Sequence, residues 1–287
     1  MKKLLILSGK GGTGKTTAAA AFIHFAQARA IADCDVDAPN LHLVTEQEAA
    51  PLSSDFLGGE KARIQQDACI GCGICQQHCR FDAIVKTDGR YRVDEYACEG
   101  CGVCRHVCPQ QAVSLHTDVA GTRFLYQGQQ VFSTAALKMG RGNSGKLVTE
   151  VKRDMLRHAP ETDLAIIDGS PGIGCPVIAS ISGVDFVVVV AEPSLSGIAD
   201  LKRLVKTTQS FQTKLAVCVN KWDISPENTA SIQAFCKENH LPFLGKVPYD
   251  KCASSAINSG RSIAQLDCPA RDALKQIYEA ASQLLAL

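Results

Sequence analysis

Residues 4–17 read Leu-Leu-Ile-Leu-Ser-Gly-Lys-Gly-Gly-Thr-Gly-Lys-Thr-Thr, and this stretch decides the fold. An apolar run comes first, a glycine-rich loop follows, and an alanine-rich stretch suited to a helix comes next. This order of strand, loop and helix is what a phosphate-binding loop requires, because glycines let backbone N–H groups surround phosphate oxygens. The stretch therefore predicts an α/β fold with a nucleotide site at the end of its first strand.

The loop supplies the candidate phosphate contacts. The G-x4-G-K-T pattern assigns Lys15 to the β- and γ-phosphates and Thr16 to a Mg2+ ion. The other loop residues expected to contact the nucleotide are Gly9, Gly11, Gly12, Thr13, Gly14 and Thr17.

Lys10 places a second lysine inside the loop and gives the deviant Walker A pattern Lys-Gly-Gly-x-Gly-Lys-Thr. By this pattern the chain resembles the MinD, ParA and Mrp family of P-loop ATPases, which also contains the nitrogenase iron protein. The resemblance implies ATP as the nucleotide and a dimer in which Lys10 reaches the nucleotide of the second subunit. The alternative is that Lys10 is a solvated loop charge.

Three aspartates alternate after the next apolar segment, at Asp33, Asp35 and Asp37. Alternation places them on one side of the chain if strand geometry persists, and carboxylates beside Mg-ATP can orient an attacking water. Resemblance to the first switch segment of the family implies that Asp35 positions this water and that Asp33 lies in the outer Mg2+ shell. Asp37 has no assigned role. A solvated acidic turn is the alternative.

Asp168 ends a further apolar run at 164–167, which is the Walker B arrangement that holds Mg2+ through water. More strands are predicted at 186–191 and 215–219, with helices between them. The expected fold is therefore a mostly parallel P-loop NTPase sheet with helices on both faces.

The stretch Asn220-Lys221-Trp222-Asp223 leaves the base open. Taken alone, N-K-x-D is the guanine-recognition motif of GTPases, in which Asp223 would contact the base edge. In the family that the chain resembles, the equivalent asparagine contacts adenine, so ATP is favoured and GTP is not excluded. Pro248 is expected to pack near the same base.

Two runs of four cysteines share the spacing C-x2-C-x2-C-x3-C, which is typical of bacterial ferredoxins with two [4Fe–4S] clusters. In such proteins the fourth cysteine of each run ligates the other cluster. The ligands expected for the first cluster are Cys69, Cys72, Cys75 and Cys108. Those expected for the second are Cys98, Cys101, Cys104 and Cys79.

Zinc and disulfides are weaker interpretations of these cysteines. Zinc sites pair their ligands over longer separations, and disulfides require an oxidising compartment. The apolar stretch at the N-terminus is too short for a signal peptide, so a reducing cytoplasmic location is expected.

The cysteine runs lie between the phosphate-binding loop and Asp168, which predicts an insertion. The ATPase core is expected at 1–59 and 119–287, and a small α+β ferredoxin domain at 60–118. A net charge of +1 over 287 residues argues against nucleic-acid binding, and the chain has no apolar run of membrane-spanning length. The segment 271–287 is expected to be an ordinary packing helix.

Taken together, the motifs resemble MinD-superfamily ATPases that contain an inserted ferredoxin domain. The resemblance implies a Mg-dependent ATPase that couples nucleotide state to electron transfer. The alternatives are an ATP-dependent carrier for iron–sulfur or metal-cluster assembly and a redox-sensing positioning switch. Expected partners are a second copy or a related chain, and a redox or iron–sulfur client protein.

Cys175 follows Asp168 by seven residues, where the nitrogenase iron protein has a cluster-ligating cysteine. This likeness suggests a further cluster held between two subunits at Cys175, although the second, upstream ligand of that protein has no counterpart here.

Overall fold

The computed structural model describes residues 1–286, which divide into two compact units. Unit 1 comprises Met1–Ser53, Arg123–Ala136 and Ser144 onward. Unit 2 comprises Ser54–Thr122 and Leu137–Asn143, a wider range than the 60–118 expected for the insertion.

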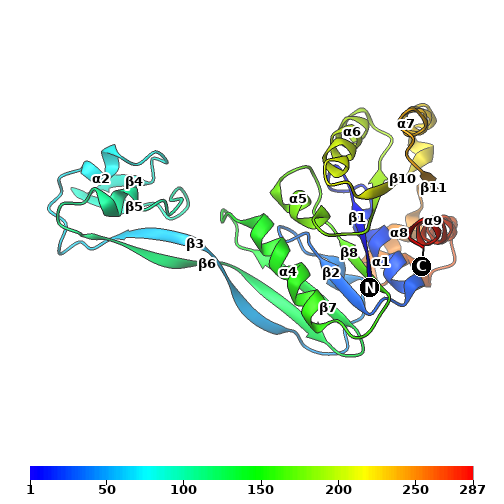
Figure 1. The fold of residues 1–287 in the computed structure, drawn as a ribbon, viewed down its shortest axis with the longest axis horizontal. Coiled ribbons are helices and arrows are strands. Elements are labelled where there is room, and N and C mark those ends of the chain that lie inside the picture. Colours follow the sequence, from blue (N-terminus) through cyan, green and yellow to red (C-terminus); the bar gives the residue numbers. More distant parts are fainter. Residues whose placement is uncertain (287) are drawn as a thin grey trace. The chain divides into compact units, whose positions relative to one another are not determined.

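The main sheet is mixed and mostly parallel (Figure 1). Within residues 1–286 it has nine strands, in the order β11-β10-β9-β1-β8-β2-β7-β6-β3. Their bounds are β1 (Lys2–Leu7), β2 (Ala30–Asp33), β3 (Leu52–Ile64), β6 (Val113–Gln127), β7 (Val131–Leu137), β8 (Leu164–Asp168), β9 (Phe186–Ala191), β10 (Lys214–Asn220) and β11 (Phe243–Val247).

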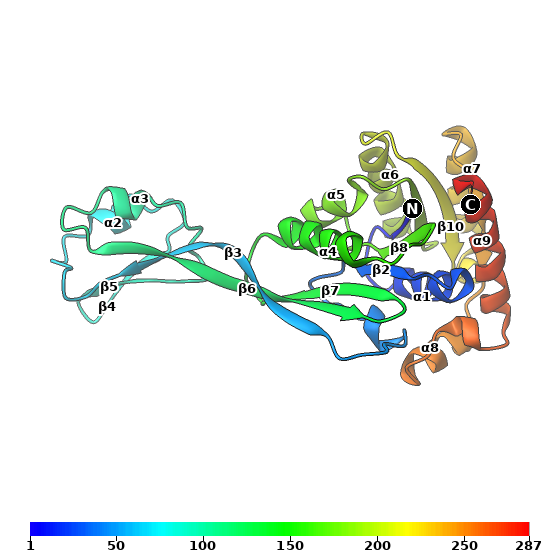
Figure 2. The same cartoon turned by 60° about the horizontal axis from the view of Figure 1, so that its bottom comes forward.

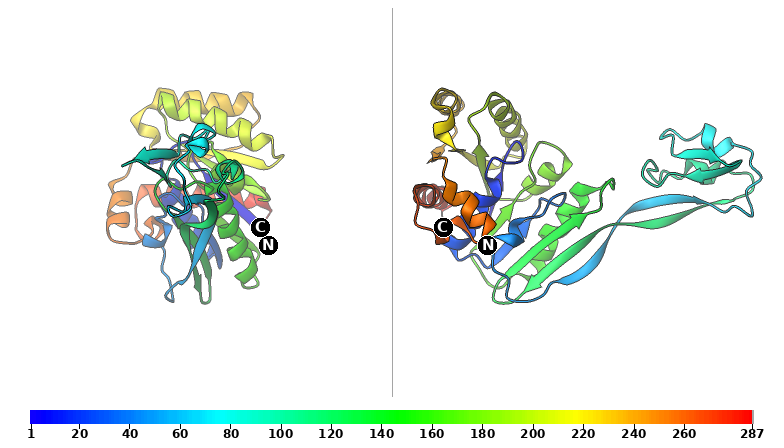
Figure 3. Two further views of the ribbon diagram at one scale, coloured as in Figure 1. Left: turned by 90° about the vertical axis from the view of Figure 1, so that its left-hand side faces the viewer. Right: turned by 180° about the vertical axis from the view of Figure 1, so that it is seen from behind.

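Helices cover both faces of this sheet. The helices of unit 1 are α1 (Lys15–Ala26), α4 (Ser144–His158), α5 (Cys175–Ile181), α6 (Leu195–Gln209), α7 (Pro226–Glu238), α8 (Lys251–Asn258) and α9 (Pro269–Leu285). Helices α1 and α9 pack together on one face, as Figure 2 shows. Helices α4 and α5 pack together on the other face, and α6 and α7 lie side by side there (Figure 3).

The central strands form because their apolar residues are buried on both faces of the sheet. Strands β8 and β9 are buried along their whole length, as near-continuous apolar runs in parallel sheets usually are. Helix α1 buries Ala18–Ala21, and these small side chains let it lie close to the sheet. The predicted α/β class, the mostly parallel sheet and the strands at 164–168, 186–191 and 215–219 are confirmed.

The strand order indicates where a ligand would bind. Strand β1 lies between β8 and β9, and the chain leaves it toward β2 on one side and returns to β9 on the other. In open α/β sheets, ligands bind beyond the carboxyl ends of the strands at such a switch point. The phosphate-binding loop follows β1 at this point.

Two local features bear on the sequence predictions. Strand β2 ends at Asp33, so Asp35 and Asp37 lie in a turn rather than on one side of a continuing strand. The expected C-terminal packing helix is α9, which buries Leu274, Ile277 and Ala281. Its predicted last residue, Leu287, lies outside the described residues.

Unit 2 contains an antiparallel hairpin and two single-turn helices. Strands β4 (Ile84–Thr87) and β5 (Arg90–Val93) pair with each other, and helices α2 (Ile74–Gln77) and α3 (Val103–His106) each begin after a glycine with positive φ. The long strands β3 and β6 pair with each other and contribute residues to both units.

Candidate functional site

A cavity of about 600 Å³ lies beside the phosphate-binding loop in unit 1. This volume is in the usual range for a small-molecule site. Its walls include the loop residues from Lys10 to Thr17 except Thr13, together with Asp35, Asp37 and Asn220. The cavity therefore gathers segments that the sequence analysis assigned separately to the nucleotide.

The loop adopts a backbone that specific glycines permit. Gly12 and Gly14 have φ values of 77° and 92°, which side chains rarely adopt. A Cβ on Gly14 would also lie 2.2 Å from the side-chain nitrogen of Asn220. This nitrogen donates to the carbonyl of Thr13 at 2.8 Å, so Asn220 braces the loop where helix α1 begins.

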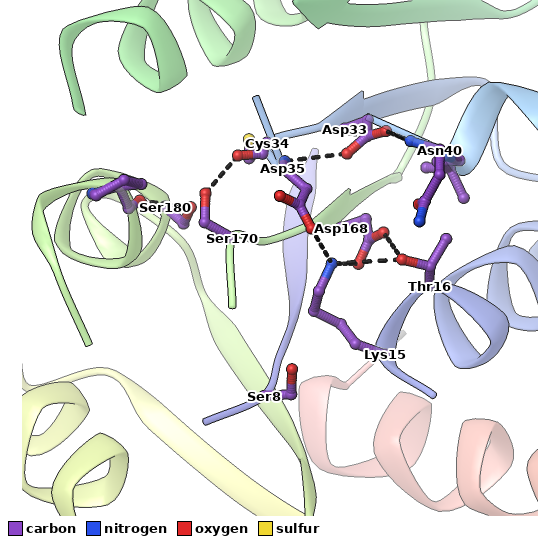
Figure 4. A network of polar contacts seen from close by, with 12 residues as sticks. Ser8, Lys15, Thr16, Asp33, Cys34, Asp35, Asn40, Asp168, Ser170 and Ser180 are labelled. Carbon is purple, nitrogen blue, oxygen red and sulfur yellow. Dashed lines mark hydrogen bonds and ion pairs between the residues drawn. The ribbon is translucent and has the colours of Figure 1, made fainter. Parts of the chain in front are cut away.

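Lys15 is buried between two carboxylates (Figure 4). Its Nζ lies 2.7 Å from Asp168 Oδ1 and 3.8 Å from Asp35 Oδ2. Burial alone lowers the pKa of Lys15, but the nearby aspartates, Asp168 first, more than offset it and the net pKa is raised. The lysine is therefore a fixed positive charge at the loop, where phosphate oxygens would compete for it.

Thr16 and Asp168 meet as the predicted Mg2+ ligands should. The hydroxyl of Thr16 donates to Asp168 Oδ2 at 2.7 Å, and Asp168 is fully buried at the end of β8. Mg2+ takes oxygen ligands, and in phosphate-binding loops these include the Thr hydroxyl and, directly or through water, a carboxylate. These two side chains fit a Mg2+ ion held beside the phosphates.

Asp33 organises the segment that follows β2. Its carboxylate accepts backbone N–H groups from Asp35 at 3.0 Å, Asn40 at 3.2 Å and Leu41 at 3.1 Å (Figure 4). Burial and the neighbouring Asp168 raise the pKa of Asp33 to about 7, although Lys15 and the amides oppose this. The carboxylate thus connects both ends of the turn that carries Asp35 and Asp37.

Asp35 lies closer to the cavity than Asp33 does. It is partly buried, lines the cavity and contacts the ammonium of Lys15. Burial raises the pKa of Asp35, and Lys15 opposes this rise. Asp37 also lines the cavity.

Lys10 is held within its own chain. Its Nζ lies 2.7 Å from Glu192 Oε2 and 3.1 Å from the hydroxyls of both Ser194 and Ser196. Glu192 also pairs with Lys221 at 3.5 Å, and Lys221 donates to the carbonyl of Gly12 at 3.0 Å. The Lys10 hydrogen bond lowers the pKa of Glu192, so this carboxylate stays charged near neutral pH.

Of the three residues predicted to contact the base, two line the cavity and one does not. Asn220 and Pro248 line the cavity, together with Lys221 and Tyr249. The carboxylate of Asp223 instead accepts the backbone N–H of Tyr249 at 2.7 Å, which fixes the loop after β11.

Some predicted residues lie outside the cavity wall. Gly9 is packed against Asp200, where a Cβ would approach to 2.4 Å, and Thr13 is buried. Cys175 is exposed as the first residue of α5.

The eight cysteines of unit 2 gather around two separate hollows. The first hollow is lined by Cys69, Cys72, Cys75 and Cys108. The second is lined by Cys79, Cys98, Cys101 and Cys104. The structure thus brings together the same two groups of four that the exchange of fourth ligands predicts.

These thiols fit an iron–sulfur cluster by their surroundings. The N–H of Ala112 donates to Cys108 Sγ at 3.3 Å, and that of Ala62 donates to Cys98 Sγ at 3.4 Å. Backbone N–H groups directed at ligand sulfurs are a usual feature of cluster sites. Gly100 has a φ of 66°, and a Cβ there would lie 2.0 Å from the carbonyl of Glu60, so only glycine suits this position.

Three residues of unit 1 that make polar contacts are not singled out by the sequence motifs. Glu192 joins two lysines, Ser170 donates to the carbonyl of Cys34, and Lys152 donates to the carbonyls of Ala179, Ser180 and Ser182. Glu192 and Ser170 each follow a strand that ends beside the cavity. The sequence signal that could have identified these two residues is their position just after a strand predicted to be buried.

Two relatives match over almost the whole chain. An uncharacterized protein of Methanocaldococcus jannaschii, MJ0578, is 30% identical over 284 residues, which cover 96% of this chain and 95% of the relative. An uncharacterized ATP-binding protein of the same organism, MJ0547, is 26% identical and covers 96% of this chain and 85% of the relative.

A partial match and a solved structure complete the comparison. An iron–sulfur cluster carrier protein of Methanococcus maripaludis is 26% identical over 130 residues, which cover 41% of this chain and 45% of that protein. The septum site-determining protein MinD of Pyrococcus horikoshii, solved with Mg-ADP, has a TM-score of 0.57 and 16% identity and covers 99% of this chain and 96% of its own.

The family is shown by a match over most of the sequence. The family model for the CobQ/CobB/MinD/ParA nucleotide binding domain matches residues 4–263, which include the phosphate-binding loop, Asp168 and Asn220. Since the fold and the loop geometry agree with this match, the chain belongs to the CobQ/CobB/MinD/ParA family of nucleotide-binding domains.

Proposed function

We propose that this protein is a Mg-dependent ATPase that binds two [4Fe–4S] clusters and couples its nucleotide state to electron transfer. One observation carries the proposal: eight cysteines surround two hollows, four to each, in a chain whose other unit is a nucleotide-binding domain. A cluster enclosed by four cysteines is suited to remain in place while it exchanges electrons. Unit 2 is thus the proposed ferredoxin insertion.

The contacts of Lys15, Thr16, Asp35 and Asp168 support the proposed roles in unit 1. Lys15 binds the β- and γ-phosphates, Thr16 and Asp168 hold Mg2+, and Asp35 orients the attacking water. ATP rather than GTP is supported by the name of the relative MJ0547 and by the Mg-ADP of the structurally similar MinD. Asp223 is occupied by the N–H of Tyr249, which leaves it less free to contact a guanine.

The position of the Lys10 side chain is the basis for the proposed dimer. Its bonds to Glu192, Ser194 and Ser196 hold its ammonium at the cavity in the single chain. On binding ATP, a second copy or a related chain would receive this lysine at its nucleotide. The first switch segment continues into β3, which carries the chain into unit 2 and offers a covalent route for coupling.

Cluster delivery to a client protein is the second candidate function. The partial match to the cluster carrier of M. maripaludis favours it. Delivery requires a cluster that leaves the protein, whereas four enclosing cysteines favour retention. Cys175, exposed on α5, is the position at which a shared and more labile cluster would be held.

The test measures cluster content and its fate on one anaerobic preparation. The proposal expects about eight iron and eight sulfide per chain, since each of two clusters contains four of each. It also expects Mg-ATP hydrolysis without loss of iron to an apo-ferredoxin acceptor. Half that iron content, or zinc in its place, would contradict the proposal, and ATP-stimulated transfer would favour the carrier function.

A further inference from the structure

Three side chains with metal-binding chemistry meet where helices α8 and α9 begin. A carboxylate oxygen of Asp250 and the sulfurs of Cys252 and Cys268 all lie within 4.8 Å of one another. Cys268 is buried, and the other two are half-buried. This group belongs to unit 1 and is separate from the cysteines of unit 2.

The carboxylate of Asp250 is fixed in place. It accepts the N–H of Cys252 at 2.9 Å and the N–H of Ala270 at 3.3 Å, so it connects the first turns of both helices. Both sulfurs also lie within 4.8 Å of an oxygen of this carboxylate. The three ligand atoms are thus held at the N-terminal ends of two helices and not by one flexible loop.

We propose that Asp250, Cys252 and Cys268 bind a thiophilic divalent cation, for which Zn2+ is the best chemical match. Zinc is bound in proteins by cysteine sulfur and carboxylate oxygen together. The ion displaces one proton from each thiol, so two thiols and M2+ give two metal-bound thiolates and two protons. No oxidant or reductant takes part.

The spacing agrees with this chemistry. Zn–S bonds of about 2.3 Å and Zn–O bonds of about 2.1 Å in a tetrahedron place neighbouring ligand atoms roughly 3.5–3.8 Å apart. The observed upper limit of 4.8 Å requires only small side-chain rotations to reach these values.

A disulfide between Cys252 and Cys268 is the competing use of the same thiols. It would need an oxidant and would make no use of Asp250. The convergence of the carboxylate on both sulfurs therefore favours a cation.

The site has a consequence for the nucleotide cavity. Pro248, Tyr249 and Asp250 belong to the loop after β11, and all three line that cavity. A cation at Asp250 would fix this wall relative to α9. This inference does not depend on the proposed electron transfer.

The test uses the full chain with its iron sites loaded anaerobically. Protein is incubated with Zn2+, passed over a desalting column and analysed for zinc and by zinc-edge X-ray absorption. The expected result is one zinc per chain with two sulfur scatterers and the remainder oxygen or nitrogen. Four sulfur scatterers would place the zinc in the cysteine hollows of unit 2 and overturn the proposal.

Variants localise the ion. Cys268→Ser and Cys252→Ala are expected to lose the zinc, whereas Cys236→Ala, which removes a buried thiol on α7, is expected to retain it. Serine is favoured at a helix N-cap, and Cys268 is the N-cap of α9, so the first variant should fold. Cys252→Ala provides a second variant if it does not.

Three outcomes contradict the proposal. They are wild-type protein that retains no zinc, variants that retain as much zinc as wild type, and a Cys252–Cys268 disulfide detected by mass spectrometry in zinc-free protein prepared under the same conditions.

Discussion

The buried ammonium of Lys15 and the carboxylates around it form the chemical centre of unit 1. Lys15 contacts Asp168 and Asp35, and Asp168 also accepts the hydroxyl of Thr16. One positive charge therefore holds the end of β8 and the turn after β2 close to the phosphate-binding loop. Phosphate binding would redistribute these contacts, which offers a physical link between nucleotide and the switch segment.

Lys15→Ala tests the phosphate contact. Loss of charge-assisted hydrogen bonds worth about 1.5–3 kcal/mol is expected to weaken Mg-ATP binding by roughly 10- to 150-fold. Titration calorimetry measures the change, with Lys237→Ala on α7 as a charge-matched control. Unaltered affinity in Lys15→Ala would show that the phosphates bind elsewhere.

Asp35→Asn tests the proposed water-positioning role. The amide keeps the shape of the side chain but is a poor proton acceptor, so hydrolysis is expected to slow by roughly 10²- to 10⁴-fold. Mg-ATP affinity should change little, because the phosphate contacts remain. Steady-state hydrolysis and calorimetry on the same sample separate these effects, and a variant that loses binding with its activity would refute the assignment.

At the scale of elements, Lys152 joins α4 to the end of α5. Its ammonium donates to the carbonyls of Ala179, Ser180 and Ser182 at 2.6–2.8 Å. These carbonyls lie in the last turn of α5 and just beyond it, where they lack partners within the helix. The lysine thereby holds the helix that follows Asp168 and begins at Cys175.

Lys152→Met is expected to lower the free energy of unfolding by roughly 2–4 kcal/mol, because it leaves buried carbonyls without donors. Chemical denaturation under reducing conditions measures the loss. Lys146→Met, at the start of the same helix, serves as the comparison. Equal stability of Lys152→Met and wild type would mean that water satisfies these carbonyls.

The pKa of Lys152 predicts that the stability of the fold depends on pH. Burial lowers the pKa of Lys152 from 10.5 to about 8 in the folded protein. Between about pH 8 and pH 10.5, Lys152 loses its proton in the folded protein but keeps it in the unfolded chain. Stability rises with pH wherever the unfolded chain binds more protons than the folded protein, so the contribution of Lys152 to stability rises across this window. The stability difference between wild type and Lys152→Met should therefore increase from pH 8 to pH 10, and a flat difference would contradict this.

The elements near the loop could be predicted from sequence because their signals are local. A continuous apolar run predicts a buried strand, and Gly12 and Gly14 mark the turn that follows β1. The end of β2 at Asp33 could not be predicted in this way, since the Asp33 carboxylate is satisfied by amides up to eight residues later. Glu192 was missed because it meets Lys10 only when β9 lies beside β1.

At the scale of the whole molecule, one chain combines a nucleotide-binding unit with a cysteine-rich unit. In residues 1–286 no helix has the length and hydrophobicity needed to cross a bilayer. The family and the α/β fold followed from the motifs, whereas the biological task depends on partners that the sequence does not specify.

Paired cysteine variants test how the ligands are distributed. Cys69→Ser and Cys108→Ser are expected to remove the same EPR signal, and Cys79→Ser and Cys98→Ser the other, because the fourth ligand of each cluster comes from the other run. Cys236→Ala is the control, because it removes a cysteine but leaves all eight proposed cluster ligands in place. Pairing of Cys108 with Cys98 instead would contradict the proposed ligand sets.

The most direct test of the central claim is an anaerobic redox titration monitored by EPR. It is performed without nucleotide, with Mg-ATP and with a non-hydrolysable ATP analogue. Coupling requires that ATP bind with different affinity to two states of the protein, so a nucleotide-dependent shift in cluster potential or line shape is predicted. At a Mg-ATP concentration just sufficient to saturate the wild type, Lys15→Ala should reduce that shift strongly while keeping both clusters. Clusters with the same potential and line shape under all three conditions would contradict ATP-gated electron transfer.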